Sequence, residues 1–257
     1  MTTPKVSTVK KGGSRFYIHP TSRLQVPGVT SVVGMLPKEF LKFWAAKVTA
    51  EAAVDNVGAV VNLVANGDRD GAIDYLKRAH MRSVGKSADI GTDVHDVVER
   101  LSRGEQVGRV HPDLQVFVDH FNEFLDIFQP EYLFLEETVW SETHGYAGSF
   151  DAIAVIQGET IIIDNKTTKS GVHAEVALQM AAYANADYIV SADGDKVPLP
   201  TIDGAAVLHL RPEGWNLVPV AITPEVFQVF LNLIPVVSWE RELSRSVVGR
   251  PLSKELK

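Results

Sequence analysis

From Glu131 onward, apolar and polar residues alternate with a period of two, which is the pattern of half-buried β-strands. Turn residues such as His144-Gly145 divide this pattern into segments. Two helices are also expected here, from about residue 174 to 190 and from Pro224 to about Leu243. The alternation predicts five strands, over residues 132–140, 146–156, 160–166, 205–211 and 215–220.

The first half of the chain has apolar residues at helical spacing instead. Gly85 is expected to interrupt this helical pattern. After a short strand at 15–18, helices are predicted over residues 30–36, 38–54, 70–82, 91–101 and 112–128. The second of these helices carries an apolar stripe that recurs every four residues and is expected to face the core; it consists of Phe40, Trp44, Val48 and Ala52.

This order of helices and strands predicts an α/β fold with a central mixed β-sheet flanked by helices and a mostly helical N-terminal part. At 257 residues, the chain is long enough to bury a sizeable core. We expect an N-terminal arm and helical region over residues 1–84, and a core with a C-terminal helix over residues 85–257.

The composition limits the chemistry. The chain has no cysteine, which excludes disulfides, thiolate zinc sites, iron–sulfur clusters and cysteine nucleophiles, so any metal must be held by oxygen and imidazole. The formal net charge of −7 means that nucleic-acid binding requires a locally basic surface. No apolar run is long enough to cross a bilayer, and the start lacks an apolar signal core. We therefore expect a cytoplasmic protein, in a bacterial cell or phage-infected host, without a membrane partner.

The stretch from Gly148 to Lys166 is the most informative part of the sequence. The predicted buried strand at 160–166 ends in Asp164-Asn165-Lys166, and period-two alternation puts Asp164 and Lys166 on one face. Together with Asp151, this brings two carboxylates and an ammonium group into one small space. Such a cluster is costly to desolvate unless a divalent cation binds the carboxylates and an anion binds the lysine. A metal site that handles phosphate meets both conditions.

Four short motifs carry a family resemblance. Gly148-Ser-Phe-Asp151 stands thirteen positions before Asp164-x-Lys166, Gln179-x-x-x-Tyr183 follows, and Gly91-x-x-x-His95 lies upstream. Their order and spacing resemble the RecB-type branch of the PD-(D/E)xK nuclease superfamily over about residues 85–215. The segment from Val29 to Trp44 is similar to the entry region of phage-encoded exonucleases of this branch. The resemblance implies a restriction-endonuclease-like core.

The resemblance also implies roles for individual residues. Asp151 and Asp164 match the metal-binding acids, Lys166 the catalytic lysine and His95 the upstream metal-ligand histidine. Gln179 and Tyr183 match a helix motif that faces the active site and contacts DNA, although Tyr183 also fits a core aromatic residue. The main-chain carbonyl of Ile163 would complete the ligand set, and the candidates for a further acid are Glu99, Glu136 and Glu137.

Two acids and a carbonyl suit one or two Mg²⁺ ions, and the imidazole of His95 shifts the preference toward Mn²⁺. Lys166 would hold the attacking water and the phosphate, or act as the base if its pKa is lowered. A basic run fits contacts with the DNA backbone, or alternatively a solvated face that balances nearby aspartates; it consists of Lys77, Arg78, Arg82 and Lys86.

The sequence thus predicts a metal-dependent exonuclease that hydrolyses phosphodiester bonds at the ends of duplex or single-stranded DNA, in recombination, repair or phage DNA processing. Water would attack phosphorus in line, the 3′ oxygen would leave, and the products would carry 5′ phosphates. A recombinase or single-strand annealing protein is a candidate partner. The alternatives are a structure-selective endonuclease that cuts flaps or junctions with the same site, and a non-catalytic module that binds DNA ends.

Overall fold

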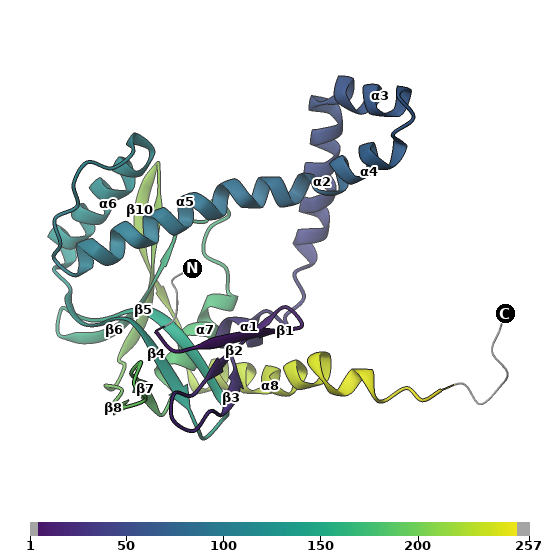
Figure 1. Cartoon of the computed structure of the whole chain (residues 1–257). Coiled ribbons are helices and arrows are strands. Elements are labelled where there is room, and N and C mark those ends of the chain that lie inside the picture. Colours follow the sequence, from purple (N-terminus) through teal and green to yellow (C-terminus); the bar gives the residue numbers. More distant parts are fainter. Residues whose placement is uncertain (1–4, 251–257) are drawn as a thin grey trace. The chain divides into compact units, whose positions relative to one another are not determined.

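The computed structural model describes residues 5–250, without the side chains of 83–90 (Figure 1). It has two compact units, one formed by the described residues up to Leu36 with those from Val94 onward, the other by Pro37–Asp93. This division differs from the predicted boundary at residue 84. The N-terminal residues join the sheet because Gly28 bridges to Ala147 in the backbone.

The first unit is built on a mixed seven-stranded sheet, which confirms the predicted fold class (Figure 1). All neighbouring strands are antiparallel except β6 and β9, which are parallel. The five predicted strands agree with the observed ones to within one residue at each end. Across the sheet the order is β10 (Gly214–Val220), β9 (Gly204–Arg211), β6 (Glu159–Lys166), β5 (Tyr146–Ile156), β4 (Glu131–Ser141), β7 (Tyr188–Val190) and β8 (Lys196–Val197).

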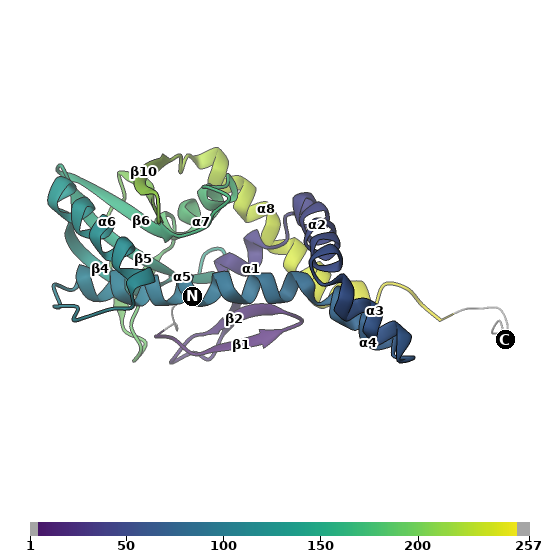
Figure 2. The ribbon, with the colours of Figure 1, turned by 90° about the horizontal axis from the view of Figure 1, so that it is seen from above.

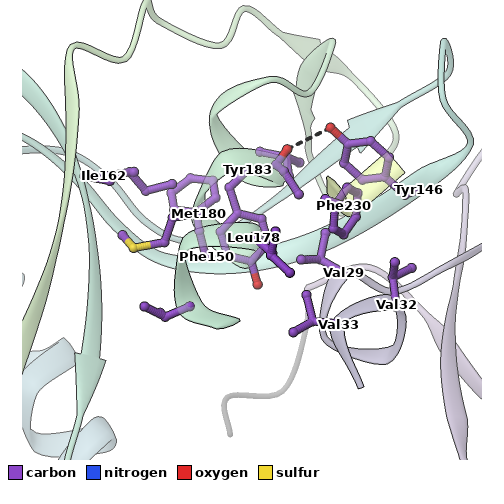
Figure 3. Packing of buried hydrophobic residues seen from close by; sticks show 14 of the residues in the cluster. Val29, Val32, Val33, Tyr146, Phe150, Ile162, Leu178, Met180, Tyr183 and Phe230 are labelled. Atoms are coloured by element: carbon purple, nitrogen blue, oxygen red, sulfur yellow. Dashed lines mark hydrogen bonds between the residues drawn. The ribbon is translucent and has the colours of Figure 1, made fainter. Parts of the chain in front are cut away.

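Helices pack on both faces of this sheet. One face packs against α1 (Val29–Val33), α7 (Glu175–Ala184) and α8 (Pro224–Arg241). Figure 3 shows this core, where the Tyr146 hydroxyl donates to the Ala182 carbonyl at 2.8 Å. The other face packs against α6 (Pro112–Phe128) and the C-terminal part of α5 (Ala79–Ser102). The central strands β5 and β6 are therefore covered on both sides.

A small three-stranded sheet precedes the large one in the chain. It consists of β1 (Thr8–Lys11), β2 (Ser14–Ile18) and β3 (Gln25–Pro27), with β1 and β2 side by side in Figure 2. Its buried residues, among them Tyr17 and Val26, pack against Trp140 and Ala147 of the large sheet. The N-terminal segment is thus part of the same folded unit.

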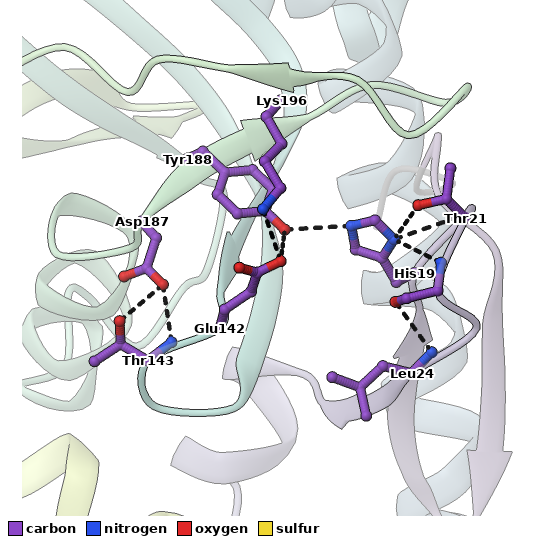
Figure 4. Close-up of polar contacts among 9 residues, drawn as sticks. His19, Thr21, Leu24, Glu142, Thr143, Asp187, Tyr188 and Lys196 are labelled. Carbon is purple, nitrogen blue, oxygen red and sulfur yellow. Dashed lines mark hydrogen bonds and ion pairs between the residues drawn. The ribbon is translucent and has the colours of Figure 1, made fainter.

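A polar network also joins the two sheets (Figure 4). The buried ring of His19 accepts at Nδ1 from the backbone N–H of Thr21. Its Nε2 therefore carries the proton and donates to the Tyr188 hydroxyl at 3.2 Å, and this hydroxyl donates to Glu142 at 2.9 Å. Lys196 completes the network at 2.8 Å from Glu142. The buried polar groups of this contact are therefore satisfied.

The second unit is helical and corrects several predictions. It contains α2 (Glu39–Asp55), α3 (Val57–Ala65), α4 (Arg69–Lys77) and the start of α5. All of α2 is described, and none of its residues is fully buried. Within the predicted stripe, Phe40 is half exposed at 50%, whereas Trp44, Val48 and Ala52 are half-buried, so this face is only partly covered. The helix predicted over 70–82 ends at Lys77, and α5 continues through Gly85 without a break.

Among the described residues, no single helix combines the length and hydrophobicity needed to cross a membrane. The pair α2 and α3 reaches both only when its two helices are counted together across a 77° bend.

The helix predicted from about residue 174 to 190 is also shorter than expected. It ends at Ala184, where the Asn185 side chain donates to the Ala181 carbonyl at 2.8 Å and caps the last turn. The next apolar residues, Tyr188–Val190, form β7 and pair with β4. A short apolar run of this kind is ambiguous between helix and strand, and pairing with β4 decides it.

Candidate metal centre

The charged residues of the sheet gather where β5 and β6 separate. The ladder between these strands ends at the pair Ala152 and Ile163. One residue beyond it, Oδ2 of Asp151 accepts a hydrogen bond of 2.7 Å from the backbone N–H of Asn165. The carboxylate thus takes the place of a strand partner. The ladder between β5 and β6 thus stops beside Asp151 and Asp164.

Glu136 of β4 lies beside this fork. Its neighbours pair in register, Leu135 with Ala152 and Glu137 with Phe150, so Glu136 stands opposite Asp151. Its φ of 53° is unusual for a residue other than glycine and marks a backbone position under strain. Such strain persists where the surrounding structure requires the side chain to point in one direction.

The strained position coincides with a break in the strand alternation. Phe134 and Val139 are five residues apart, yet both pack in the core on the side of α7. Phe150 and Ile153, three residues apart on β5, do the same. Strict alternation would put each pair on opposite faces, so both strands change the direction of their side chains between these positions. Glu136 and Asp151 lie at this change.

His95 of α5 completes a group of three potential metal ligands. One ligand atom from each of His95, Glu136 and Asp151 lies within 4.8 Å of the other two. Nδ1 of His95 is 3.8 Å from Oδ2 of Asp151, is buried, and has no hydrogen-bond partner in the part of the chain that the structure describes. Burial lowers the pKa of His95, although Asp151 opposes this shift. The neutral imidazole that results is the form that binds metals.

These residues fit a divalent cation. Two carboxylates and one imidazole form a ligand set of the type that Mg²⁺ and especially Mn²⁺ accept. A buried imidazole nitrogen without a hydrogen-bond partner carries a desolvation cost, which a bound cation would remove. The fit therefore rests on the donor chemistry and on the unpartnered nitrogen of His95.

Asp164 lies beside this group but is held by other residues. Its Oδ1 accepts from Nε2 of Gln179 at 3.1 Å, and its Oδ2 is 2.6 Å from Nζ of Lys166. Burial raises the pKa of Asp164 to about 6, with Asp151 adding to the rise and Lys166 opposing it. The two predicted acids are thus close enough to interact electrostatically, but Glu136 is the second carboxylate near His95.

Lys166 remains a cation in this setting. Burial disfavours its charged form, but the carboxylates of Asp164 and Asp151 outweigh that cost and raise its pKa. The alternative in which a lowered pKa makes this lysine the base is therefore not supported. Its side chain is 33% exposed, so the ammonium group can meet an anion from solvent.

Tyr183 belongs to the hydrophobic core. Its side chain is 2% exposed and packs beside Phe150, and burial raises the pKa of its hydroxyl well above the usual value. A Cβ added to Gly148 would come within 2.6 Å of its ring, so only glycine fits there. This arrangement supports a packing role, and a contact of Tyr183 with DNA stays a prediction.

The other candidate acids are engaged elsewhere. Glu99 pairs with Arg103 at 2.8 Å, and Glu137 pairs with Lys5. Ile163 is buried and its backbone has strand partners on both sides. Metal ligation by its carbonyl stays a prediction. Of the three glutamates that were candidates for the further acid, Glu136 is the one that lies near His95 and Asp151.

The basic run predicted to contact DNA belongs to the second unit, Pro37–Asp93. Arg78 pairs with Asp74 at 2.9 Å, and the guanidinium of Arg82 stacks on the ring of Tyr75 at 4.4 Å. The side chain of Lys86 is not among the described ones. The ion pair of Arg78 confirms, for this residue, the alternative in which the basic run balances nearby aspartates. A contact with DNA stays a prediction for Lys77, Arg78, Arg82 and Lys86.

Comparison with known proteins adds no family assignment. The chain matches no protein-family model and no curated protein. The resemblance to the RecB-type branch therefore stays a prediction from the motifs, and the function has to be argued from the site itself.

Proposed function

We propose that the protein is a metal-dependent deoxyribonuclease that hydrolyses phosphodiester bonds. The observation that carries this proposal is the position of Lys166 and Asp164 beside the ligand group His95, Glu136 and Asp151. Ligands for a cation and the ammonium group of Lys166 then lie close together at one point of the sheet. A substrate that carries negative charge on a phosphate group satisfies both.

His95, Glu136 and Asp151 would hold one Mg²⁺ or Mn²⁺ ion. When bound, the ion stabilises charge on phosphate oxygens and makes water more acidic. The imidazole contributes only as the neutral base, which its burial favours. Asp151 has a second task, because it also accepts from the backbone of Asn165 and so fixes the separation of β5 and β6.

Lys166 would bind the scissile phosphate. Its side chain is partly exposed, and its ammonium group lies 2.6 Å from the buried carboxylate of Asp164. Gln179 holds the other oxygen of that carboxylate, so the lysine is oriented before the substrate arrives. This preorganisation would stabilise the charge that develops on the phosphate in the transition state.

Hydrolysis of labelled DNA tests the proposal. Linear duplex labelled at one end is incubated with Mn²⁺ and the wild-type protein, the Asp164→Ala variant, or Asp126→Ala as a control for loss of an exposed acid in α6. We expect cleavage by the wild type and the control, none by Asp164→Ala, and none in EDTA. Absence of cleavage in Mn²⁺ by a folded wild-type protein would refute the assignment and favour the DNA-binding module.

A closed circular duplex separates the two nuclease candidates. The exonuclease assignment comes from the motif resemblance and predicts that the circle stays intact while a linear duplex of the same sequence is degraded. Cutting of the circle, or of a flap or junction in preference to a plain end, would assign the same site to a structure-selective endonuclease.

A further inference from the structure

The hairpin formed by β1 and β2 contains two cations directly opposite each other. In the antiparallel ladder, Lys10 pairs with Arg15. Like charges in such a pair repel and destabilise the sheet. Within the described residues, neither side chain has a carboxylate at ion-pair distance. The hairpin therefore retains a repulsive pair that nothing described in the protein neutralises.

Protection of a sheet edge explains only half of this pair. β1 is an edge strand of the small sheet, and exposed lysines at an edge prevent unwanted strand pairing. That accounts for Lys10. Arg15 lies on β2, the central strand, where edge protection does not apply. Its position opposite a lysine needs another explanation.

The pair lies on the face of the hairpin that carries Tyr17, whose hydroxyl contacts the strand of Asp151. Alternation puts Lys10 and Arg15 on the same face as Tyr17. The Tyr17 hydroxyl accepts from the backbone N–H of Ser149 at 3.1 Å, and Ser149 is two residues before Asp151. Two residues of strand separate Arg15 from Tyr17, which is about 7 Å. The two cations thus lie on the same face of the hairpin as a residue that contacts the strand carrying Asp151.

A third cation lies near the tip of the hairpin, on the face opposite to Lys10 and Arg15. Gly12 and Gly13 form the turn with φ values of 55° and 86°, which other residues rarely adopt. Arg241 of α8 lies against this turn, with its Nε donating to the Ser14 hydroxyl at 2.9 Å. A Cβ on Gly12 would come within 3.0 Å of the Arg241 side chain, so the glycine also leaves room for it.

We propose that this hairpin face, formed by Lys10 and Arg15, binds backbone phosphates of the DNA that enters the site. The inference rests on the proposed nuclease function. A phosphate between Lys10 and Arg15 would replace repulsion by two attractions. Because the chain as a whole carries a net charge of −7, such a local surface is needed to bring a polyanion close to the carboxylates.

Equilibrium binding of DNA without divalent ions tests the inference. Fluorescein-labelled duplex is titrated in EDTA, at several salt concentrations, with wild type, Lys10→Gln/Arg15→Gln and Lys10→Glu. The matched control is Arg100→Gln, a cation of the same unit that is already paired with Glu105 at 3.1 Å. We expect the double variant to bind roughly tenfold more weakly and to release about two fewer counterions, and the control to bind as the wild type does.

The Lys10→Glu variant separates binding from folding. Its glutamate would face Arg15 and turn the repulsive pair into an attractive one, so the melting temperature should not fall while DNA affinity does. Wild-type affinity in both hairpin variants, or absence of DNA binding by the wild type, would overturn the inference. Cleavage plays no part in this measurement, so a failed digestion in Mn²⁺ refutes the nuclease and leaves the hairpin result to stand on its own.

Discussion

Burial has opposite effects on stability at the two ends of the β5–β6 strand pair. At one end, Ala154, Ile156 and Ile161 pack against the α6 side in an apolar core. At the other, Asp151, Asp164 and Lys166 gather where the ladder stops. The apolar end is stabilised by removal from water, whereas burial of the charges at the opposite end costs stability. One end of this strand pair thus stabilises the fold, and the other end carries the charged residues of the proposed site.

The largest effect is expected for a change that keeps the shape of the charged end. Asp151→Asn preserves an oxygen that can accept from Asn165 but removes the charge that a cation requires. We expect cleavage in Mn²⁺ to slow by at least about a thousandfold, or about 4 kcal/mol in the barrier. End-labelled digestion measures this. A melting temperature close to that of the wild type would show that the loss is chemical, and retained cleavage would remove Asp151 from the site.

The apolar end should show the opposite behaviour. Ile156→Ala leaves a cavity in the core between β5 and α6 and should lower the free energy of unfolding by about 3 kcal/mol. The urea midpoint checks this value. At temperatures where the variant is folded, its rate of cleavage should match that of the wild type. A large catalytic loss in the folded variant would contradict the separation of the two ends.

The ligand group can be tested by stabilisation with metal alone. Mn²⁺ at about a hundred times its dissociation constant should stabilise the wild type by about 2.7 kcal/mol. Glu136→Gln should lose most of this shift, which differential scanning fluorimetry follows. The neighbouring variant Glu137→Gln is the matched control, because Glu137 pairs with Lys5 instead. Equal shifts in the two variants would rule out Glu136 as a ligand.

The smallest effect concerns the metal-free protein. The folded-state pKa of Asp164 is raised to about 6, so its ionisation costs stability as the pH rises through that value. A rise of this size corresponds to about 3 kcal/mol, and loss of the ion pair with Lys166 in the variant offsets part of that gain. In EDTA, Asp164→Asn should therefore be about 1 kcal/mol more stable than the wild type near pH 8, and this gain should largely disappear near pH 4. Thermal melts across this range provide the measurement. A variant that is less stable at both pH values would contradict the stated cost of burying this charge.

The sheet was predictable because its strands carry their own signals. The run Thr160–Ile163 and the turns around it fix β6, and the same holds for β5. The helical unit was harder, since the spacing of Phe40 and Trp44 predicts a helix correctly but does not say whether that face is covered. Tyr188–Val190 form a strand because they pair with β4. The local sequence pattern does not contain this long-range pairing.

The candidate site was predictable in part for a similar reason. Alternation and motif spacing brought together Asp164, Lys166 and Gln179, and the structure joins them by direct contacts. Glu136 was left undecided against Glu137 because alternation fails at its positive φ. The cross-strand repulsion between Lys10 and Arg15 depends on a register that the sequence did not reveal.

One irregularity of β4 has a consequence for how this chain can vary. The ladder with β5 pairs Tyr132 with Ala154 but Phe134 with Ile153, so Leu133 is an extra residue in the strand. Loss of this single residue would shift the following segment by one position in the ladder. The side chains of Glu136 and Glu137 would then exchange the faces of the sheet to which they point. Insertions and deletions before Glu136 should therefore be tolerated only in compensating pairs, which makes the length of this segment as important as its composition.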